Sequence, residues 1–484
     1  MTSISTPSRR TFLKSAVAGA AGLALPASVR AASEGANGEA RIAVIGIRSQ
    51  GNGHINRTLS GKGCRLVAIC DADSDVLAQR KGDCEKAGAK VEAYTDYRKL
   101  IENPDIDGVM IATPNHLHTL IAVAAAQAGK HVYVEKPVSH NIWEGRQLAR
   151  AAEVYDKVVI HHGMQRRSDT GWREIGEWIK DEPLGKMICS RGLCYKNRPS
   201  IGKLDAPKDP PSSVDYNLWS GPREIMPVRR AQFHYDWHWQ FPYGNGDIGN
   251  QGPHQLDVAR WMLGDPQLPA RVMSIGGRFG YEDDGNTPNT QIAFFDYKPV
   301  PLIFEVRGLP RADMDYKGGD SDYKGGRIAN VLEFEGGYVV EGKAVDNDGK
   351  TVHKFGVTDG SGHFENWIES IHTGKKDPNF SAETGHLSSA LAHMANVSYQ
   401  LGEGSDPGEI NERLSGDKLA AESFARMQEH LEANGVDLSK SQAQAGPWLD
   451  FDPESETFTG EFGDKANEAA TGSYRDEFAI PKIG

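Results

Sequence analysis

The most constraining feature of the sequence is the alternation of short apolar runs with amphipathic segments between residues 41 and 134. Four apolar runs have the length of buried strands, at residues 41–47, 65–70, 108–112 and 131–134. Two segments between them, at residues 75–87 and 118–128, have helical periodicity. Strands that alternate with helices of this length are typical of βαβ units, whose strands run parallel. The sequence therefore predicts an α/β protein with an N-terminal doubly wound parallel sheet.

The pattern changes after about residue 165, where strand-like segments follow one another without helices of similar length between them. These segments lie at residues 187–195, 270–275, 290–297, 302–307, 330–335 and 337–341. Helical periodicity returns at residues 364–373 and 385–401. Successive strands separated by turn residues are typical of antiparallel sheets. We expect a second, α+β domain with a large, mostly antiparallel open sheet.

Four parts follow from these patterns. We place a signal peptide at residues 1–32, a dinucleotide-binding domain of the Rossmann type at residues 38–163, a substrate and oligomerisation domain at residues 164–400, and a C-terminal extension at residues 401–484. From Trp448 onward this extension is rich in Asp and Glu, with scattered aromatic residues. We expect that last stretch to be an extended tail that packs over the body of the protein.

The N-terminus has the composition of an export signal. A basic segment, Ser8-Arg9-Arg10-Thr11-Phe12-Leu13-Lys14, precedes a mildly apolar run and a cluster of small residues. This segment resembles a bacterial twin-arginine (Tat) leader. The resemblance implies export to the periplasm by the Tat machinery, which carries proteins that have already folded.

Charge and cysteine content exclude several classes of function. Lys and Arg total 54 against 66 Asp and Glu, a net charge of −12, and no basic stripe is present to meet a phosphate backbone. We therefore expect no nucleic-acid partner. Five cysteines without a Cys-x-x-Cys pair predict neither a zinc site nor a disulfide framework. We expect no bound metal, although Cys189 and Cys194 remain a possible pair.

The first strand leads into a glycine-containing turn, Gly46-Ile47-Arg48-Ser49-Gln50-Gly51. Gly46 and Gly51 occupy the first and third positions of the G-x-G-x-x-G dinucleotide fingerprint, and Arg48 replaces the second glycine. The second strand ends at Asp71, where an acid accepts hydrogen bonds from ribose hydroxyls and repels a 2′-phosphate. This pattern favours NAD(H) over NADP(H), although a solvated strand-end aspartate would look the same.

Two further motifs follow strands of the predicted parallel sheet. They are Thr113-Pro114-Asn115-His116-Leu117-His118 and Glu135-Lys136-Pro137, and a later glycine-rich loop leads into a helix that carries His254 and Asp257. Ligands of open α/β sheets bind outside the carboxyl ends of the strands. Together with Gly53-His54 in the first turn, these motifs resemble the Gfo/Idh/MocA oxidoreductases over roughly residues 41–400. This family includes glucose–fructose oxidoreductase and inositol dehydrogenase.

The resemblance implies roles for particular residues. Lys136 would contact both nicotinamide and substrate, and His254 would take the hydroxyl proton during hydride transfer. Inositol-dehydrogenase-like members carry an aspartate four residues before that histidine, where this chain has Asn250. An amide cannot act as a base, so we expect Asn250 to orient substrate hydroxyls. Asp247 is a nearby alternative acid.

We therefore expect three overlapping groups of site residues. The catalytic residues are Lys136, His254 and Asn250. The cofactor-binding residues are Gly46, Arg48, Ser49, Gly51, Asp71, Thr113, Pro114, Asn115, His118, Glu135, Lys136, Gln165 and Arg166. The substrate-binding residues are Lys136, Trp237, Trp239, Asp247, Asn250 and His254. The tryptophans suit the CH faces of a sugar, and a plain core cluster is the alternative.

The leading hypothesis is an exported NAD(H)-dependent oxidoreductase acting on a secondary hydroxyl of a sugar, polyol or glycoside. Because the periplasm supplies no ready NAD, we expect a tightly bound cofactor that is recycled within the site. A first alternative is a glycoside hydrolase or lyase that works through transient oxidation. A second is a non-catalytic sugar-binding or scaffold protein. By resemblance, we also expect a homo-oligomer built on the antiparallel sheet.

Overall fold

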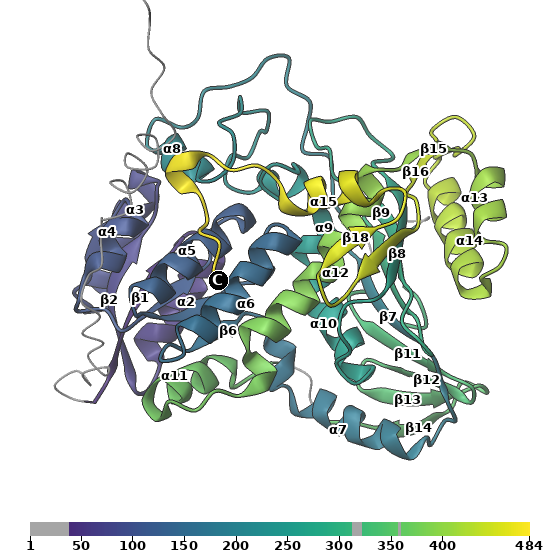
Figure 1. Cartoon of the computed structure of the whole chain (residues 1–484), viewed down its shortest axis with the longest axis horizontal. Helices are drawn as coiled ribbons and strands as arrows, with labels where there is room; N and C mark the ends of the chain where they lie inside the picture. The colour runs from purple at the N-terminus through teal and green to yellow at the C-terminus, as the bar shows by residue number, and fades with distance from the viewer. Residues whose placement is uncertain (1–37, 312–321, 357–359) are drawn as a thin grey trace, which may run out of the picture. The chain divides into compact units, whose positions relative to one another are not determined.

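The computed structural model describes residues 38–311, 322–356 and 360–484. The predicted signal peptide at residues 1–32 lies outside these residues. The described chain contains two sheets, the first built from residues 40–162 and the second from residues 187–459 (Figure 1).

The first sheet has six parallel strands in the order β3-β2-β1-β4-β5-β6. Its strands are β1 Ala40–Ile45, β2 Cys64–Cys70, β3 Glu92–Tyr94, β4 Gly108–Ile111, β5 His131–Val134 and β6 Ile160–His162. The helices along this part of the chain are α2 Gln50–Ser60, α3 Ser74–Lys86, α4 Tyr97–Glu102, α5 Asn115–Gln127 and α6 Ile142–Val154. The predicted parallel sheet is confirmed. Strand β3 was not predicted, because its three residues are exposed or half-buried and carry no apolar run.

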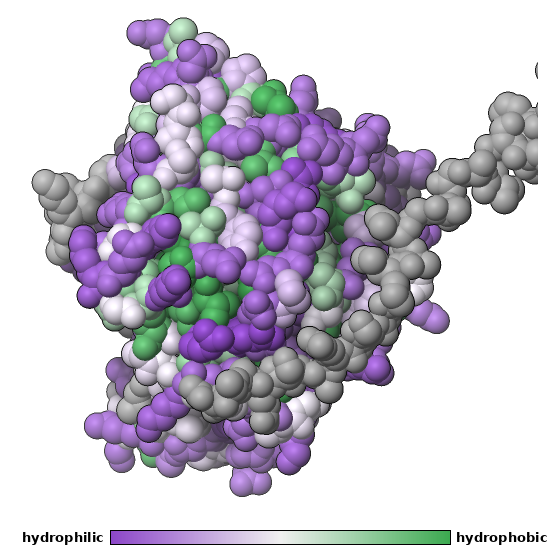
Figure 2. Space-filling view, turned by 90° about the vertical axis from the view of Figure 1, so that its left-hand side faces the viewer, coloured by the Kyte–Doolittle hydropathy of each residue, from purple (hydrophilic) through white to green (hydrophobic). Residues whose placement is uncertain are grey.

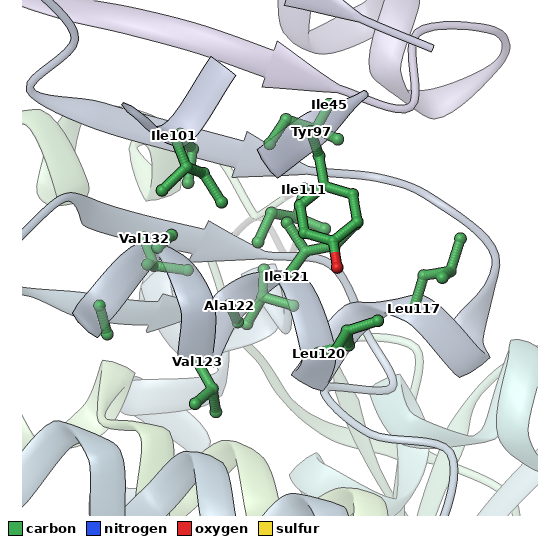
Figure 3. Close-up of a cluster of buried hydrophobic side chains, with 14 of the residues drawn as sticks. Ile45, Tyr97, Ile101, Ile111, Leu117, Leu120, Ile121, Ala122, Val123 and Val132 are labelled. Atoms are coloured by element: carbon green, nitrogen blue, oxygen red, sulfur yellow. The ribbon is translucent and has the colours of Figure 1, made fainter. Parts of the chain in front are cut away.

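Helices α4 and α5 pack on one face of this sheet (Figure 3). Ile45, Ile111 and Val132 of the central strands meet Leu120 and Ile121 of α5, and all five are at most 6% exposed. A parallel strand buried on both faces needs a continuous apolar run, which is the signal that the sequence carries. This core holds the carboxyl ends of the strands in place.

The second sheet has twelve strands, and all of its pairs are antiparallel except β7 with β10. The strands are β7 Met187–Tyr195, β8 Arg271–Gly277, β9 Thr290–Phe295, β10 Leu302–Arg307, β11 Asn330–Phe334, β12 Gly337–Val340, β13 Lys343–Asp346, β14 Thr351–Lys354, β15 Glu403–Ser405, β16 Ala443–Ala445, β17 Leu449–Asp452 and β18 Thr457–Thr459. The predicted antiparallel sheet is confirmed and is larger than expected.

Helices cover both faces of this second sheet. The α-helices of the second half are α7 Thr170–Trp178, α8 Tyr216–Ser220, α9 Gly246–Asn250, α10 Gly252–Met262, α11 His363–Thr373, α12 Ala382–Gln400, α13 Pro407–Leu414, α14 Lys418–Ala433 and α15 Gly463–Thr471. Alternate strand residues face opposite sides. Val272 and Phe295 pack with α10 and α12, whereas Met273 and Phe294 pack with α13 and α14. Helices α13 and α14 thus cover the part of this second face that β8, β9 and β10 form.

The C-terminal extension is an integral part of the fold. It supplies β15 to β18 and α13 to α15, and its last residues return to the parallel sheet, where Phe478, Ile480 and Ile483 join the buried cluster of α5. The expectation of an extended tail missed the β17–β18 hairpin and α15. The hairpin strands have four and three residues, too short for a clear period-2 pattern.

Residues 197–245, which we call the strap, connect β7 to α9 and contain only two short helices, α8 and a 3₁₀ turn at Asp236–Trp239. The strap reaches the turn between β2 and α3. Ser74 N–H donates to the Ser213 carbonyl at 2.9 Å, and Asp215 N–H donates to the Ala72 carbonyl at 2.9 Å. His234 Nε2 lies 2.7 Å from Asp73 Oδ2. The strap therefore links the second half of the protein to the parallel sheet.

Disulfides, membrane-spanning helices and surface polarity remain to be considered for the described residues. All five cysteines are buried and none of them forms a disulfide, so Cys189 and Cys194 are not joined in this structure. No helix in the described ranges has the length and apolarity needed to cross a membrane. The face shown in Figure 2 is predominantly hydrophilic, with apolar residues in small groups between the polar ones.

Candidate active site at the ends of the parallel strands

A pocket of about 760 Å³ lies at the carboxyl ends of β1, β2, β4 and β5. Its wall also includes residues of the strap and the beginning of α10. This size is typical of small-molecule and cofactor sites. The position agrees with the rule that open parallel sheets bind ligands beyond their strand ends.

The β1–α2 turn forms one end of the pocket. Gly46 has φ +77°, and a Cβ there would lie 2.7 Å from the Thr113 nitrogen. A Cβ on Gly51 would lie 1.7 Å from the Gly46 carbonyl oxygen, so both positions require glycine. Helix α2 begins at Gln50, and the Ser49 side chain makes no capping hydrogen bond. The first N–H groups of α2 therefore remain available to an anion.

Asp71 stands at the end of β2 and lines the same pocket. Its carboxylate accepts hydrogen bonds from the backbone N–H groups of Ile47 and Asp73, both at 3.0 Å. Burial raises the pKa of Asp71, and these two hydrogen bonds oppose that rise. The carboxylate thus braces the turn and still faces the pocket, where it can accept hydrogen bonds from ribose hydroxyls.

Glu135, at the end of β5, is clamped to helix α2. Its Oε1 accepts a hydrogen bond from Gln50 Nε2 at 3.0 Å and lies 3.0 Å from His54 Nε2. Burial raises the pKa of Glu135, but the His54 hydrogen bond and the nearby charges hold it below its usual range. Glu135 therefore remains a carboxylate beside Lys136. The sequence had indicated His54 through Gly53-His54, whereas Gln50 was missed.

Lys136, Asn250 and His254 meet at the other end of the pocket. Lys136 Nζ donates a hydrogen bond to the Asn250 backbone carbonyl at 2.6 Å. Burial lowers the pKa of Lys136, while Glu135 and Asp247 favour its charged form. The Asn250 side-chain amide lines the pocket and has no hydrogen-bond partner among the described residues. It is therefore available to a ligand.

His254 lies in the first turn of α10. Burial, together with the charge of Lys136, lowers the pKa of His254 to about 3, so the imidazole is neutral near pH 7. Its Nδ1 is buried and has no hydrogen-bond partner in the part of the chain that the structure describes. Asp257 does not pair with it, because Arg167 holds that carboxylate through three contacts of 2.8–3.0 Å.

The structure brings most of the expected residues to one pocket. Its wall contains Gly46, Arg48, Ser49, Asp71, Thr113, Pro114, Asn115, His118, Glu135, Lys136, Gln165, Trp237, Asn250 and His254. These residues come from both halves of the chain. The Thr113 hydroxyl is buried and has no partner among the residues described, so a ligand in the pocket would satisfy it.

Four expected residues lie outside the pocket wall. Gly51 supports the turn from behind, and Arg166 approaches Asp169 at 3.6 Å. The buried Asp247 carboxylate is held by Arg198 Nη2 at 2.7 Å and Nε at 2.8 Å, so the expectation that it contacts substrate is not supported. Trp239 is buried with its ring 4.9 Å from the Arg198 guanidinium carbon, and it acts as core.

The strap contributes pocket residues that the sequence did not indicate. Besides the expected Trp237, they include Arg198, Trp219, His234, Tyr235 and His238. His238 stacks on Trp237 with ring centroids 3.6 Å apart, and Trp237 also belongs to a buried cluster with Trp219 and Phe233. A histidine- and aromatic-rich stretch at residues 233–239 was the available signal, but nothing in it showed that it would reach the first sheet.

Two histidines of the Thr113–His118 motif connect loops through contacts with backbone carbonyls, which is a structural role. His118 Nδ1 lies 2.6 Å from the Pro137 carbonyl and Nε2 lies 2.7 Å from the Thr113 carbonyl. His116 Nε2 lies 2.8 Å from the Trp219 carbonyl, which anchors the strap. Among the described residues, no group of three or more His, Cys, Asp or Glu side chains has the arrangement of a metal site.

Comparison with known proteins agrees with this geometry. Residues 40–162 match the family model GFO_IDH_MocA, described as the oxidoreductase family with an NAD-binding Rossmann fold. This part of the chain is therefore similar to the NAD-binding domain of that family. Myo-inositol 2-dehydrogenase from Thermotoga maritima is 29% identical to this chain over 181 residues, which are 37% of this chain and 49% of that protein.

Other relatives extend the comparison. Glycosyl hydrolase family 109 protein 2 from Shewanella sp. is 35% identical over 170 residues, 30% of this chain and 37% of that protein. The chain thus aligns with about half or less of these curated relatives. A crystal structure of the WlbA dehydrogenase from Bordetella pertussis with NADH and UDP-GlcNAcA shares the fold, with a TM-score of 0.53 and 19% identity over 73% of this chain and 94% of that one.

Proposed function

We propose that this protein is an NAD(H)-dependent oxidoreductase that acts on a secondary hydroxyl of a sugar, polyol or glycoside. The observation that carries the proposal is the meeting of Lys136, the Asn250 side chain and His254 in the pocket that the β1–α2 turn also lines. The curated relatives support it, since one of them is named as an inositol dehydrogenase. A non-catalytic sugar-binding role would not require a lysine and a histidine beside each other in a cofactor pocket.

The residues of the pocket fit a dinucleotide. The α2 N-terminus would hold the pyrophosphate, Asp71 the adenosine ribose, and the unpartnered Thr113 hydroxyl a further polar group. The carboxylate of Asp71 favours NAD(H) over NADP(H), because it repels a 2′-phosphate. When bound, the nicotinamide supplies the hydride acceptor of the reaction.

The protein's own groups would handle the proton and the charge. The Lys136 ammonium would donate a hydrogen bond to the reacting hydroxyl oxygen and stabilise negative charge as it develops there. The neutral His254 has a free lone pair and would accept the hydroxyl proton. The Asn250 amide would orient a neighbouring hydroxyl through its donor and acceptor atoms.

We further propose export through the twin-arginine route, on the strength of residues 8–14, with NAD carried in the folded protein. The strap supports cofactor retention, because it crosses to the β2–α3 turn beside Asp71 and is joined there by three polar contacts. A cofactor enclosed on this side would leave only after the strap moves.

The first prediction tests the function itself. Protein purified without added nucleotide should release NAD or NADH on denaturation, identified by mass spectrometry. Sugars or glycosides added to the NAD-loaded protein should produce absorbance near 340 nm, because hydride transfer creates NADH. Bound cofactor whose redox state no sugar, polyol or glycoside changes would favour the non-catalytic binding role.

One observation favours a second candidate, hydrolysis or elimination through transient oxidation, because one curated relative is named as a glycosyl hydrolase. The two reactions differ in their products. A glycoside that is cleaved while the absorbance at 340 nm rises and then returns would support the second candidate. An oxidised sugar that accumulates with its glycosidic bond intact would support simple oxidation.

The second prediction concerns cofactor retention. His234→Ala removes the 2.7 Å contact with Asp73, so the strap should open more often and NADH should dissociate at least about tenfold faster. The dissociation rate can be measured by the loss of NADH fluorescence after dilution. His372→Ala is a matched control, because it removes a contact of 2.7 Å to the Gly63 carbonyl. Equal dissociation rates in parent and His234→Ala would contradict this role of the strap.

A further inference from the structure

The strongest feature that the proposed mechanism leaves unused is a cation in the pocket wall. Lys196 directly follows β7, and its backbone N–H donates to the Arg307 carbonyl at 3.0 Å, which fixes its position on the second sheet. The side chain is half-buried and lines the pocket. Within the described residues, it has no ion pair and no side-chain hydrogen bond.

The other charged residues of the pocket wall either have a partner or lie at the cofactor end. Arg198 is paired with Asp247 through two contacts of 2.7 and 2.8 Å. Lys136 donates to the Asn250 carbonyl and lies next to the Glu135 carboxylate. Arg48 and Asp71 belong to the cofactor end of the pocket. Lys196, like Arg48 at the cofactor end, is therefore a positive charge without an ion pair among the described residues.

Lys196 lies near the reacting end of the pocket. Besides burial, which has the largest effect, the positive charges of Lys196 and Arg198 lower the pKa of Lys136. Lys196 is thus close enough to act on the ammonium group that would hold the reacting oxygen. It extends from the second sheet, whereas the pyrophosphate cradle is formed by the first.

We propose that the substrate is an acidic sugar or glycoside whose carboxylate pairs with Lys196. This inference rests on the proposed function and names its substrate class. A half-buried ammonium group without a partner loses hydration that a neutral polyol restores only in part, whereas a carboxylate forms a charge-assisted hydrogen bond. A single free cation matches one carboxylate better than a doubly charged phosphate.

The net negative charge of the whole chain contrasts with the positive charge of Lys196 in the pocket. The chain has a net charge of −12 and would repel anions in general. A local excess of positive charge in the pocket therefore works against the overall field. Selection between acidic and neutral sugars would arise at Lys196. The same contact would orient the sugar ring relative to Lys136.

The test compares Lys196→Met with the parent, both loaded with NADH. The probes are glucuronate, galacturonate and mannuronate, with glucose, galactose and mannose as their neutral counterparts. For the parent, calorimetry should show at least one uronate binding about tenfold or more tightly than its neutral counterpart. In Lys196→Met that ratio should fall by about tenfold. Lys196→Arg should retain part of it, and Lys203→Met, a lysine of the strap paired with Glu282 at 3.0 Å, should retain all of it.

Several results would overturn the inference. One is a parent that binds none of the uronates more tightly than the neutral sugars. Another is tighter binding of glucose 6-phosphate than of glucuronate, which would assign the site to phosphate. A third is weaker NADH binding in Lys196→Met with an unchanged ratio of uronate to neutral binding, which would make Lys196 a cofactor residue. Circular dichroism verifies that each variant is folded.

Because binding is measured apart from turnover, the inference and the proposed function can fail separately. Lys196-dependent binding of uronates without any NADH formation by the NAD-loaded protein would support the substrate class and contradict the oxidoreductase. Oxidation of neutral sugars that is insensitive to Lys196 would support the oxidoreductase and contradict the substrate class.

Discussion

Replacement of Lys136 by methionine is expected to lower kcat by about 10²–10⁴. The ammonium group lies at the end of β5 with its Nζ 2.6 Å from the Asn250 carbonyl, so it is held in one place before substrate binds. Methionine has a similar length but can neither donate a hydrogen bond nor stabilise an alkoxide. The measurement is the single-turnover rate of NADH formation at 340 nm with any sugar that the parent oxidises.

Three variants sharpen this prediction. His254→Asn removes the proton acceptor, and its effect combined with Lys136→Met should be less than additive if both residues serve one step. In Lys136→Arg, whatever activity remains should persist to higher pH, because burial lowers the pKa of Lys136 whereas arginine stays charged. The parent loses activity as rising pH removes the proton of Lys136. In Lys136→Arg the alkaline limb of the pH profile should therefore move to higher pH. A kcat for Lys136→Met within threefold of the parent would rule out the proposed role.

Acidification from pH 7 to pH 5 is expected to destabilise the protein strongly. Many of its histidines are buried, and burial lowers their pKa values. The lowered values are about 3 for His116, His162, His238, His254, His393 and His430, and about 4 for His131. In the unfolded chain the same groups take up protons near pH 6.5.

The direction of the effect follows from proton linkage. Between about pH 6.5 and pH 3 the unfolded chain binds more protons than the folded one, so the free energy of unfolding falls as the pH falls. Each such histidine contributes on the order of 1.4 kcal/mol per pH unit in this window. Urea denaturation followed by fluorescence at pH 7, 6 and 5 measures the loss. An unchanged midpoint across this range would contradict the prediction.

His161→Phe tests the cause of the acid sensitivity. His161 is 2% exposed, packs 5.1 Å from the Phe380 ring, and has no partner for either ring nitrogen among the described residues. Burial lowers the pKa of His161 to about 2. A phenyl ring keeps most of the packing and cannot be protonated, so stability should depend less on pH, by on the order of 1.4 kcal/mol per pH unit. Parent and variant with equal pH slopes would show that His161 plays no part.

The parts of the site that could be predicted are those that local sequence places. A strand buried on both faces carries a continuous apolar run, so β5 was predicted at His131–Val134, and Lys136 follows it at the edge where all parallel strands end. Gly46 could be predicted from its place at the first position of the glycine fingerprint. That position requires glycine, because its left-handed backbone and its close approach to Thr113 admit no side chain. These inferences need only one strand and the turn after it.

Contacts between distant segments could not be predicted in this way. Asp247 follows a glycine-rich loop that suggested a substrate contact, but Arg198, 49 residues earlier, takes its carboxylate. The strap reaches Asp73 through His234, which is 161 residues away in sequence. The choice between a carboxylate that faces a ligand and one that is already paired depends on which cation lies beside it. No spacing in the sequence specifies that neighbour.

The sequence by itself thus determined the parallel sheet, the turn glycines and the acid and lysine at the strand ends, because apolar periodicity and backbone conformation act over short distances. Only the tertiary structure decided that the strap lines the pocket, that the C-terminal helices cover part of the second sheet, and that Lys196 lines the pocket without an ion pair among the described residues. Those outcomes depend on burial and on pairs of charges brought together from separate elements, and the energy of such a pair is set by its surroundings after folding.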